Sequence, residues 1–156
     1  MILISACLAG ENVRYDGGNT FNLELKKLVD SGLAQTICPE ILGGLSIPRE
    51  PVEIVGGDGH DVLNHKAKII DIKGNDVTQD YLKGAALALK TCKALNCTTL
   101  ILKSNSPTCG STTIYSGEFN GNKKSGVGLF TAMLARHNIK VYDENNFPIS
   151  SITLNE

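Results

Sequence analysis

The sequence predicts an α/β fold, a single Rossmann-like domain with a mostly parallel sheet and helices on both faces. Short apolar runs alternate with longer amphipathic segments, an order that favours parallel strands covered by helices. The run over residues 98–103 is unbroken apolar at its centre, as in a strand buried on both faces. The length of 156 residues suits one domain, so we expect a single domain over 1–156.

The N-terminal part of the chain is expected to contain two strands with a helix between them. Residues 1–6 are an apolar run, which predicts a buried strand. Residues 21–33 place leucines among charged residues and end near Gly32, which indicates a helix. Residues 34–37 are predicted as a second strand, and the Gly- and Pro-rich stretch 43–57 as loop.

The clearest helical pattern of the chain covers residues 77–95. Apolar side chains recur there at helical spacing, and Thr78 stands where a capping side chain is expected. The strand over 98–103 follows it directly. The remaining predicted elements are a strand over 68–72, a loop over 105–122, a helix over 127–137 and a last central strand over 140–142.

Composition and charge favour a small-molecule ligand. The formal net charge is −1, and no run of Lys or Arg forms a basic stripe, so extended nucleic acid is an improbable partner. No stretch reaches the roughly 20 apolar residues that span a bilayer. The N-terminus lacks the basic start of a signal peptide, which predicts a cytoplasmic protein. Its five cysteines are then expected to remain thiols.

Three of the cysteines are expected to meet at one edge of the sheet. Cys7 ends the first predicted strand, Cys38 ends the second, and Cys109 lies beyond the strand over 98–103. Parallel strands end at the same edge, which is where open α/β sheets bind ligands. Small residues, Pro and Gly surround each thiol, and Gly110 would let the backbone approach a ligand closely. The topology therefore predicts one constellation from three dispersed residues.

The other two cysteines are interpreted as core residues. Cys92 lies on the apolar face of the helix over 77–95, and Cys97 directly precedes the central strand. A lone cysteine usually behaves as a small buried hydrophobe. We expect neither to be a ligand.

The identity of a bound metal stays open on spacing alone. Structural zinc usually takes four ligands that include close Cys pairs, whereas this chain has no C-x-x-C, and His60, His65 and His137 show no ligand spacing. Three thiolates suit a four-iron cluster that keeps one iron open. The spacing does not separate these possibilities.

A series of short motifs resembles the 2-thiouracil desulfurase family in order and content. The motifs are Ser5-Ala6-Cys7-Leu8-Ala9-Gly10, Val13-Arg14-Tyr15-Asp16-Gly17, Cys38-Pro39-Glu40, Gly43-Gly44-Leu45, Pro48-Arg49, Pro51-Val52-Glu53-Ile54, Ser106-Pro107-Thr108-Cys109-Gly110 and Ile114-Tyr115-Ser116-Gly117-Glu118-Phe119. Each motif alone is weak, but the ordered set is specific and runs from Met1 to about Val141. The chain departs from the pattern at Val13, where members often have a cysteine.

The resemblance implies an iron–sulfur enzyme that removes sulfur from a thiolated pyrimidine, turning 2-thiouracil into uracil and sulfide. It implies a 4Fe-4S cluster held by Cys7, Cys38 and Cys109, whose fourth iron takes the thiocarbonyl sulfur. It also carries the family's acidic residue onto Glu40 and its serine onto Ser106.

Glu40 and Ser106 are accordingly the candidate catalytic residues. Glu40 would act as general base for water or shuttle protons to the ring, and Ser106 would orient water or the base edge. The simpler alternatives are an ion pair of Glu40 with Arg14 or Arg49, and a turn role for Ser106. The candidates for the substrate pocket are Arg14, Tyr15, Asp16 and Arg49.

Three other functions remain possible from the sequence. The first is a non-catalytic iron–sulfur or zinc module that senses or binds. The second is desulfuration of thiolated nucleosides or tRNA, which the near-neutral charge disfavours for large RNA. The third is a plain nucleotide-binding domain, which is weak because no G-x-G-x-x-G follows the first strand.

Overall fold

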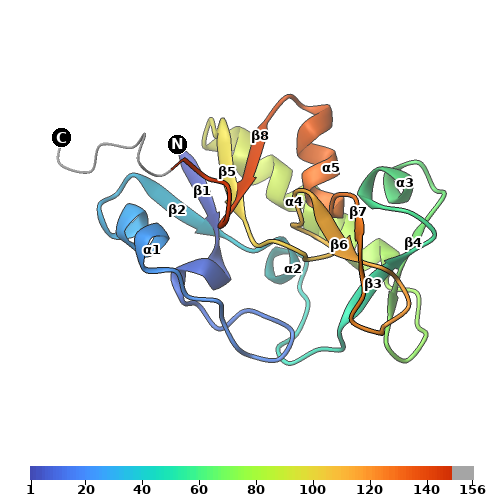
Figure 1. The fold of residues 1–156 in the computed structure, drawn as a ribbon. Coiled ribbons are helices and arrows are strands. Elements are labelled where there is room, and N and C mark those ends of the chain that lie inside the picture. The colour runs from blue at the N-terminus through green and yellow to red at the C-terminus, as the bar shows by residue number, and fades with distance from the viewer. Residues whose placement is uncertain (149–156) are drawn as a thin grey trace.

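A sheet of four parallel strands runs through the centre of the protein (Figure 1). The computed structural model describes residues 1–148. In spatial order the strands are β2 (Ala34–Ile37), β1 (Ile2–Ser5), β5 (Thr99–Leu102) and β8 (Lys140–Asp143). Every neighbouring pair is parallel, which confirms the predicted sheet.

Helices cover both faces of this sheet, as predicted. They are α1 (Leu23–Asp30), α4 (Thr78–Ala94) and α5 (Leu129–Arg136). Successive side chains of a strand point to opposite faces, so Ile4 and Ile101 pack with α1, while Leu3, Leu100 and Leu102 pack with α4 and α5. All five are fully buried, and burying each side chain stabilises the fold by about 1.5–3 kcal/mol.

The last strand occupies a different position from the one predicted. The sequence predicts a central strand over 140–142, but among the strands within residues 1–148, β8 lies at the edge of the sheet, next to β5. Its Val141 and Tyr142 are half-buried, whereas the middle of β5 is fully buried. The centre of the sheet is therefore β1 and β5.

Two antiparallel ribbons and two short helices stand beyond the central sheet. The ribbons are β3 (Val52–Val55) with β4 (Lys68–Asp71), and β6 (Thr113–Tyr115) with β7 (Lys123–Ser125). The helices are α2 (Pro39–Leu42) and α3 (Gly59–Leu63), and a 3-10 turn, η1 (Ala6–Ala9), follows β1. The predictions of continuous loop over 43–57 and 105–122 are thus wrong where β3 and β6 form.

Thr78 does not cap α4 as predicted, because it is the first residue inside the helix. Val77 is the N-cap. The Thr78 hydroxyl accepts the Ile69 N–H at 2.9 Å and donates to Asp76 Oδ1 at 2.6 Å. Asp76 Oδ1 also accepts the Thr78 N–H at 3.0 Å and so satisfies the helix start.

The short helix α2 lies against α4 through two glycines. A Cβ on Gly43 would stand 2.9 Å from Gly84 Cα, and a Cβ on Gly84 would collide with the Pro39 carbonyl oxygen. The absent side chains allow the two helices to approach closely. This contact fixes the position of α2 directly after β2.

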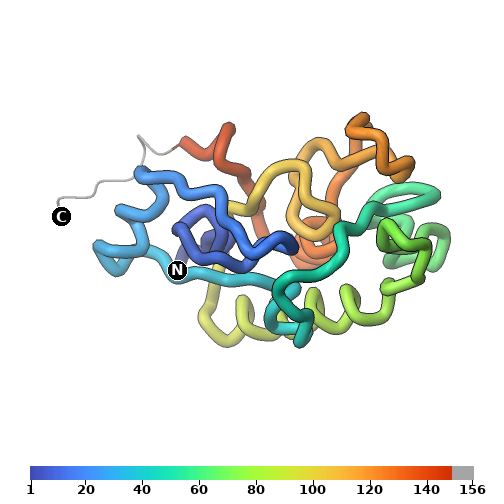
Figure 2. The backbone as a smooth tube through the Cα atoms, turned by 90° about the horizontal axis from the view of Figure 1, so that it is seen from below, coloured from blue at the N-terminus to red at the C-terminus, as the bar shows by residue number. Residues whose placement is uncertain are grey.

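The strands β1, β2 and β5 end at the same edge, seen from below in Figure 2. The segments after β1 and before β3 meet there, since the Arg49 N–H donates to the Tyr15 carbonyl at 2.8 Å. The Ser5 hydroxyl accepts the Lys103 N–H at 2.9 Å and joins the ends of β1 and β5. The edge is therefore built by three segments that lie far apart in the sequence.

None of the helices within residues 1–148 combines the length and apolar character needed to span a bilayer. The expectation of one domain over 1–156 stays a prediction, and its last residues, 149–156, lie outside the described part.

Candidate active site

A cavity of about 340 Å³ opens at the carboxyl edge of the sheet. Its walls come from the segments after β1, β2 and β5, from β3 and from the hairpin of β6 and β7. Cavities that hold small ligands start at roughly 300 Å³. The space therefore suits a single heterocycle together with a compact cofactor.

Cys7, Cys38 and Cys109 all line this cavity as free thiols. Cys7 lies in η1, Cys38 is the N-cap of α2, and Cys109 lies in the loop after β5. Cys7 and Cys109 expose only 8% and 6% of their surface, and Cys38 is half-buried. Because β2, β1 and β5 are adjacent, the fold brings together the three thiols that topology predicted would meet.

Burial raises the pKa of each of these three thiols. The pKa of Cys109 is raised further by Glu40 and by the other two cysteines. Thiols that line one cavity are suited to a metal group that displaces their protons. Within residues 1–148, no three Cys, His, Asp or Glu side chains converge as a single ion requires.

Thr20 presents an unused hydroxyl beside Cys7. Its Oγ1 is buried and has no hydrogen-bond partner among the described residues. The Thr20 N–H donates to the Cys7 carbonyl at 3.0 Å, so the two residues are neighbours. Burial raises the pKa of Cys7, whereas the Thr20 hydroxyl acts to lower it. The Thr20 hydroxyl thus has no hydrogen-bond acceptor within residues 1–148 while Cys7 is a thiol, and it could donate a hydrogen bond to Cys7 as a thiolate.

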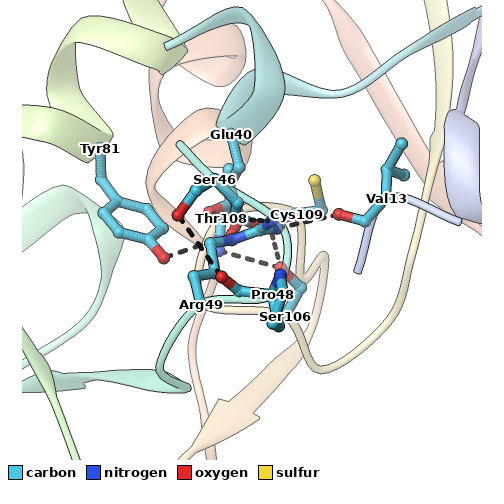
Figure 3. Close-up of polar contacts among 9 residues, drawn as sticks. All are labelled: Val13, Glu40, Ser46, Pro48, Arg49, Tyr81, Ser106, Thr108 and Cys109. Atoms are coloured by element: carbon cyan, nitrogen blue, oxygen red, sulfur yellow. Dashed lines mark hydrogen bonds and ion pairs between the residues drawn. The ribbon is translucent and has the colours of Figure 1, made fainter. Parts of the chain in front are cut away.

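Glu40 is held at the cavity wall by four hydrogen bonds (Figure 3). Its Oε1 accepts from Arg49 Nε at 3.1 Å, from Arg49 Nη2 at 2.9 Å and from the Tyr81 hydroxyl at 3.3 Å. From the described residues, its Oε2 accepts one hydrogen bond, from the Thr108 hydroxyl at 3.3 Å. Burial and the Glu40 charge raise the pKa of Tyr81, which remains a neutral donor. The carboxylate is thus fixed two residues from Cys38, with Oε2 the less engaged oxygen.

Arg49 ties three segments together. Besides Glu40, its guanidinium donates to the Val13 carbonyl at 3.0 Å and to the Ser46 carbonyl at 3.2 Å (Figure 3). Its side chain is 9% exposed. Arg49 lines the cavity as predicted for the pocket, and the ion pair considered for Glu40 is present. Its donors are engaged by the protein, so its contacts are those of a positioning residue.

Ser106 organises the loop that carries Cys109. Its Oγ accepts the N–H groups of Thr108 and Cys109, both at 3.1 Å. This is the turn role considered from the sequence. The residue also lines the cavity, and a hydroxyl that accepts two hydrogen bonds keeps its proton to donate.

Two of the remaining pocket candidates line the cavity and one does not. Arg14 and Tyr15 line it, and the Arg14 guanidinium carbon lies 5.8 Å from the Tyr15 ring centroid. Asp16 is absent from the lining, and its Oδ1 accepts the Gly18 N–H at 2.9 Å within a turn. The structure brings the first two to the cavity and leaves Asp16 outside it.

Lys103 and Glu144 form an ion pair at the rim of the cavity. Lys103 Nζ lies 3.0 Å from Glu144 Oε2, and Glu144 also accepts the Ser104 N–H at 2.8 Å and the Ser104 hydroxyl at 2.9 Å. Burial alone would raise the pKa of Glu144, but these hydrogen bonds together lower it below the usual 4.5.

Replacing Glu144 with glutamine is expected to remove about 1 kcal/mol of unfolding free energy at pH 7. Because the folded-state pKa is lowered, the wild-type contribution is complete above pH 4.5 and is lost as the pH falls through the folded pKa. Urea unfolding of both proteins at pH 7 and pH 4 measures this effect. The difference in unfolding free energy between wild type and Glu144→Gln should be smaller at pH 4. An equal difference at both pH values would show that the Glu144 charge does not stabilise the fold.

Cys92 and Cys97 take no part in the cavity. Cys92 is fully buried and Cys97 is 6% exposed, and both belong to the core under α4 and α5. The Cys97 thiol donates to the Thr99 carbonyl at 3.2 Å. Their predicted role in core packing is confirmed. His60 and His65 also lie away from the cavity lining.

Several cavity residues carried no role in the sequence interpretation. Those on the lining are Glu53, Tyr81, Lys103 and Ser104. Thr108 contacts Glu40, and Thr20 lies beside Cys7. Glu53 and Thr108 stand inside motifs that were recognised as a set, so their presence in those motifs was a usable signal. Tyr81 lies in a helix, and only the tertiary fold turns its hydroxyl to Glu40.

Known proteins resemble this chain in sequence and fold. The family model described as 2-thiouracil desulfurase matches residues 2–146. The uncharacterized protein YbbK of Bacillus subtilis (strain 168) is 49% identical over 145 residues, which cover 93% of this chain and 96% of that protein. The solved structure of the 4Fe-4S-dependent thiouracil desulfidase TudS is similar with a TM-score of 0.83 and 40% identity, covering 94% of this chain and 92% of that one.

Proposed function

This chain belongs to the 2-thiouracil desulfurase family and is thus an enzyme of the desulfurase class, and from that premise we propose that it converts 2-thiouracil to uracil and sulfide. The observation that carries the proposal is the meeting of three free thiols, two buried and one half-buried, and one fixed carboxylate in a single cavity. The volume suits a free pyrimidine, and we propose a cytoplasmic enzyme with a small-molecule substrate.

We propose that Cys7, Cys38 and Cys109 hold a 4Fe-4S cluster. The three thiols line one cavity from the segments that follow three adjacent strands. The unpartnered Thr20 hydroxyl beside Cys7 is the kind of donor that a cluster ligand would use. The neighbour TudS is described as dependent on such a cluster. When bound by three thiolates, the cluster supplies an open iron that acts as a Lewis acid toward the thiocarbonyl sulfur.

The protein's own groups handle water and protons. Exchanging the C=S sulfur for oxygen needs one water, and the sulfur leaves as hydrogen sulfide. We assign Glu40 Oε2 to accept the proton of that water, because Oε1 already accepts three hydrogen bonds. The Ser106 hydroxyl retains a proton with which to orient water or the pyrimidine edge. Arg49 and Tyr81 hold the carboxylate in position.

Replacing Thr20 with valine is expected to lower the reduction potential of the bound cluster. A hydroxyl that donates to the Cys7 thiolate stabilises the more electron-rich reduced form, and valine has the same shape without the donor. In the cluster-free protein the same change should leave the melting temperature equal or higher, since it removes an unpartnered buried hydroxyl. Potentiometric titration followed by absorbance measures the first effect.

Thr20→Ser is the matched control, because it keeps the hydroxyl and should keep the wild-type potential. An unchanged potential in Thr20→Val would show that the hydroxyl does not donate to the cluster ligand.

The test of the proposed function is anaerobic reconstitution, iron and sulfide counting, and an ultraviolet assay of 2-thiouracil loss on the same sample. We expect about four irons per chain and consumption of 2-thiouracil. A bound cluster without turnover would instead support a sensing or binding module. Stoichiometric zinc, or no metal, would overturn the cluster. Turnover of 2-thiouridine in preference to 2-thiouracil would make the nucleoside the substrate.

A further inference from the structure

We propose that Glu53 is a specificity-determining residue whose Oε2 accepts a hydrogen bond from a ring N–H of the thiolated pyrimidine. The inference deepens the proposed function and rests on it. Glu53 lies on β3 and lines the same cavity as the three cysteines, although it belongs to a different part of the fold. Neither the Glu40 network nor the cysteine set includes it.

Glu53 is a deeply buried carboxylate with only one engaged oxygen. It exposes 8% of its surface. Its Oε1 accepts the Gly117 N–H at 2.8 Å and the Phe119 N–H at 3.3 Å. Its Oε2 accepts no hydrogen bond from any residue within 1–148, and no cation of that part of the chain pairs with it. Glu53 Oε2 is not among the fully buried unpartnered atoms, so it keeps accessible surface, and Glu53 lines the cavity. A ligand N–H in the cavity can therefore donate to this oxygen.

The other two carboxylates on the cavity wall are already engaged. Glu40 accepts hydrogen bonds on both oxygens, and Glu50 forms an ion pair with Lys73 at 3.0 Å. Among these three carboxylates, Glu53 is the buried one that has no cationic partner and has one oxygen without a hydrogen bond from the described residues.

The chemistry of the pyrimidine matches this acceptor. In 2-thiouracil the thiocarbonyl carbon lies between two ring N–H groups, whereas its oxygen and sulfur are acceptors that a carboxylate repels. A hydrogen bond to Glu53 therefore selects a ring with an unsubstituted N–H and orients it. If that N–H is N1, Glu53 also distinguishes a free base from a nucleoside, in which N1 carries the sugar.

Glu53→Gln replaces the cavity-facing oxygen with an NH2 group and keeps the hydrogen bonds from the hairpin backbone. The N–H groups of Gly117 and Phe119 need an acceptor, so they select the glutamine oxygen. The glutamine NH2 then faces the cavity, where it opposes a ring N–H. The substitution keeps the shape of the side chain and the anchor of the β6–β7 hairpin, so it isolates the contact to the ring.

We expect Glu53→Gln to raise KM for 2-thiouracil about 10- to 100-fold, with kcat changed much less and iron content unchanged. Wild-type protein should reject one of the two N-methyl isomers of 2-thiouracil by a similar factor, and the isomer shows which N–H is recognised. In Glu53→Gln the factor by which the protein prefers one N-methyl isomer over the other should fall toward one. Glu118→Gln is the matched control, because Glu118 lies in the same hairpin, is exposed and does not line the cavity.

Uracil binding to the cluster-loaded protein, measured by calorimetry, distinguishes failure of the Glu53 proposal from failure of the proposed desulfurase function. Wild-type turnover with equal KM in Glu53→Gln, or discrimination that persists in the variant, would overturn the role of Glu53 and leave the function standing. No wild-type turnover, with uracil bound more weakly by Glu53→Gln, would overturn the desulfurase reaction and keep the pyrimidine contact. Neither turnover nor uracil binding would overturn both.

Discussion

Replacing Cys7, Cys38 or Cys109 singly with serine is expected to remove most of the iron from anaerobically reconstituted protein. The described cavity offers three thiols, so each loss leaves two, and a serine hydroxyl remains protonated where a thiolate would bind. The iron count should fall from about four per chain to well below one. Colorimetric iron and sulfide assays on desalted protein, with the visible absorbance of the cluster, measure the effect.

The same substitution at Cys92 or Cys97 is the control. Both side chains are buried in the core away from the cavity lining, so serine there should lower stability by about 1–2 kcal/mol and leave the iron count intact. Loss of iron from a folded Cys92→Ser or Cys97→Ser protein, or full iron in any one of the three cavity variants, would contradict the assignment of ligands.

Glu40→Gln is expected to lower kcat by about 100-fold or more while the cluster and the fold are retained. Glutamine keeps the shape of the side chain, and its carbonyl oxygen can still accept from Arg49 and Tyr81. What it loses is the ability to take a proton from water. Single-turnover assays at matched iron content measure the step directly and separate it from product release.

Tyr81→Phe is a milder variant with which to compare the loss of activity in Glu40→Gln. It removes one 3.3 Å hydrogen bond to Glu40 Oε1 and leaves the carboxylate and both Arg49 contacts in place. We expect a loss of less than about 10-fold, the scale of one neutral hydrogen bond. If Glu40→Gln turned over at the wild-type rate with a full cluster, Glu40 would be only the ion-pair partner of Arg49.

The parallel sheet and the edge where the cysteines meet could be predicted because both follow from local pattern and topology. Apolar runs mark β1 and β5, and parallel strands end together. The short ribbons could not be predicted in the same way. The run Val52–Val55 is bounded by Pro and Gly, and its pairing with β4 is a tertiary contact. The edge position of β8 likewise depends on which strand it meets, which periodicity does not encode.

The polar environment of the cavity was less predictable than its cysteines. The sequence left Glu40 between a catalytic role and an ion pair, and the structure shows the ion pair without removing the catalytic role. Glu53 and Thr20 have ordinary neighbours in the sequence. Each has one oxygen without a hydrogen bond from the described residues: the Thr20 hydroxyl is fully buried, and Glu53 lines the cavity. Only the packed structure shows this.

The three cavity cysteines follow three different strands and lie far apart along the chain. A metal site made of neighbouring residues can gather its ions while the chain is still unfolded, but the three proposed ligands meet only after β2, β1 and β5 have paired. We therefore expect iron to be delivered after folding. The newly made protein would then exist first in a folded, metal-free form, in which the raised pKa of the three thiols keeps them protonated. Slow reactivity of protonated, shielded thiols would protect that waiting state from oxidation.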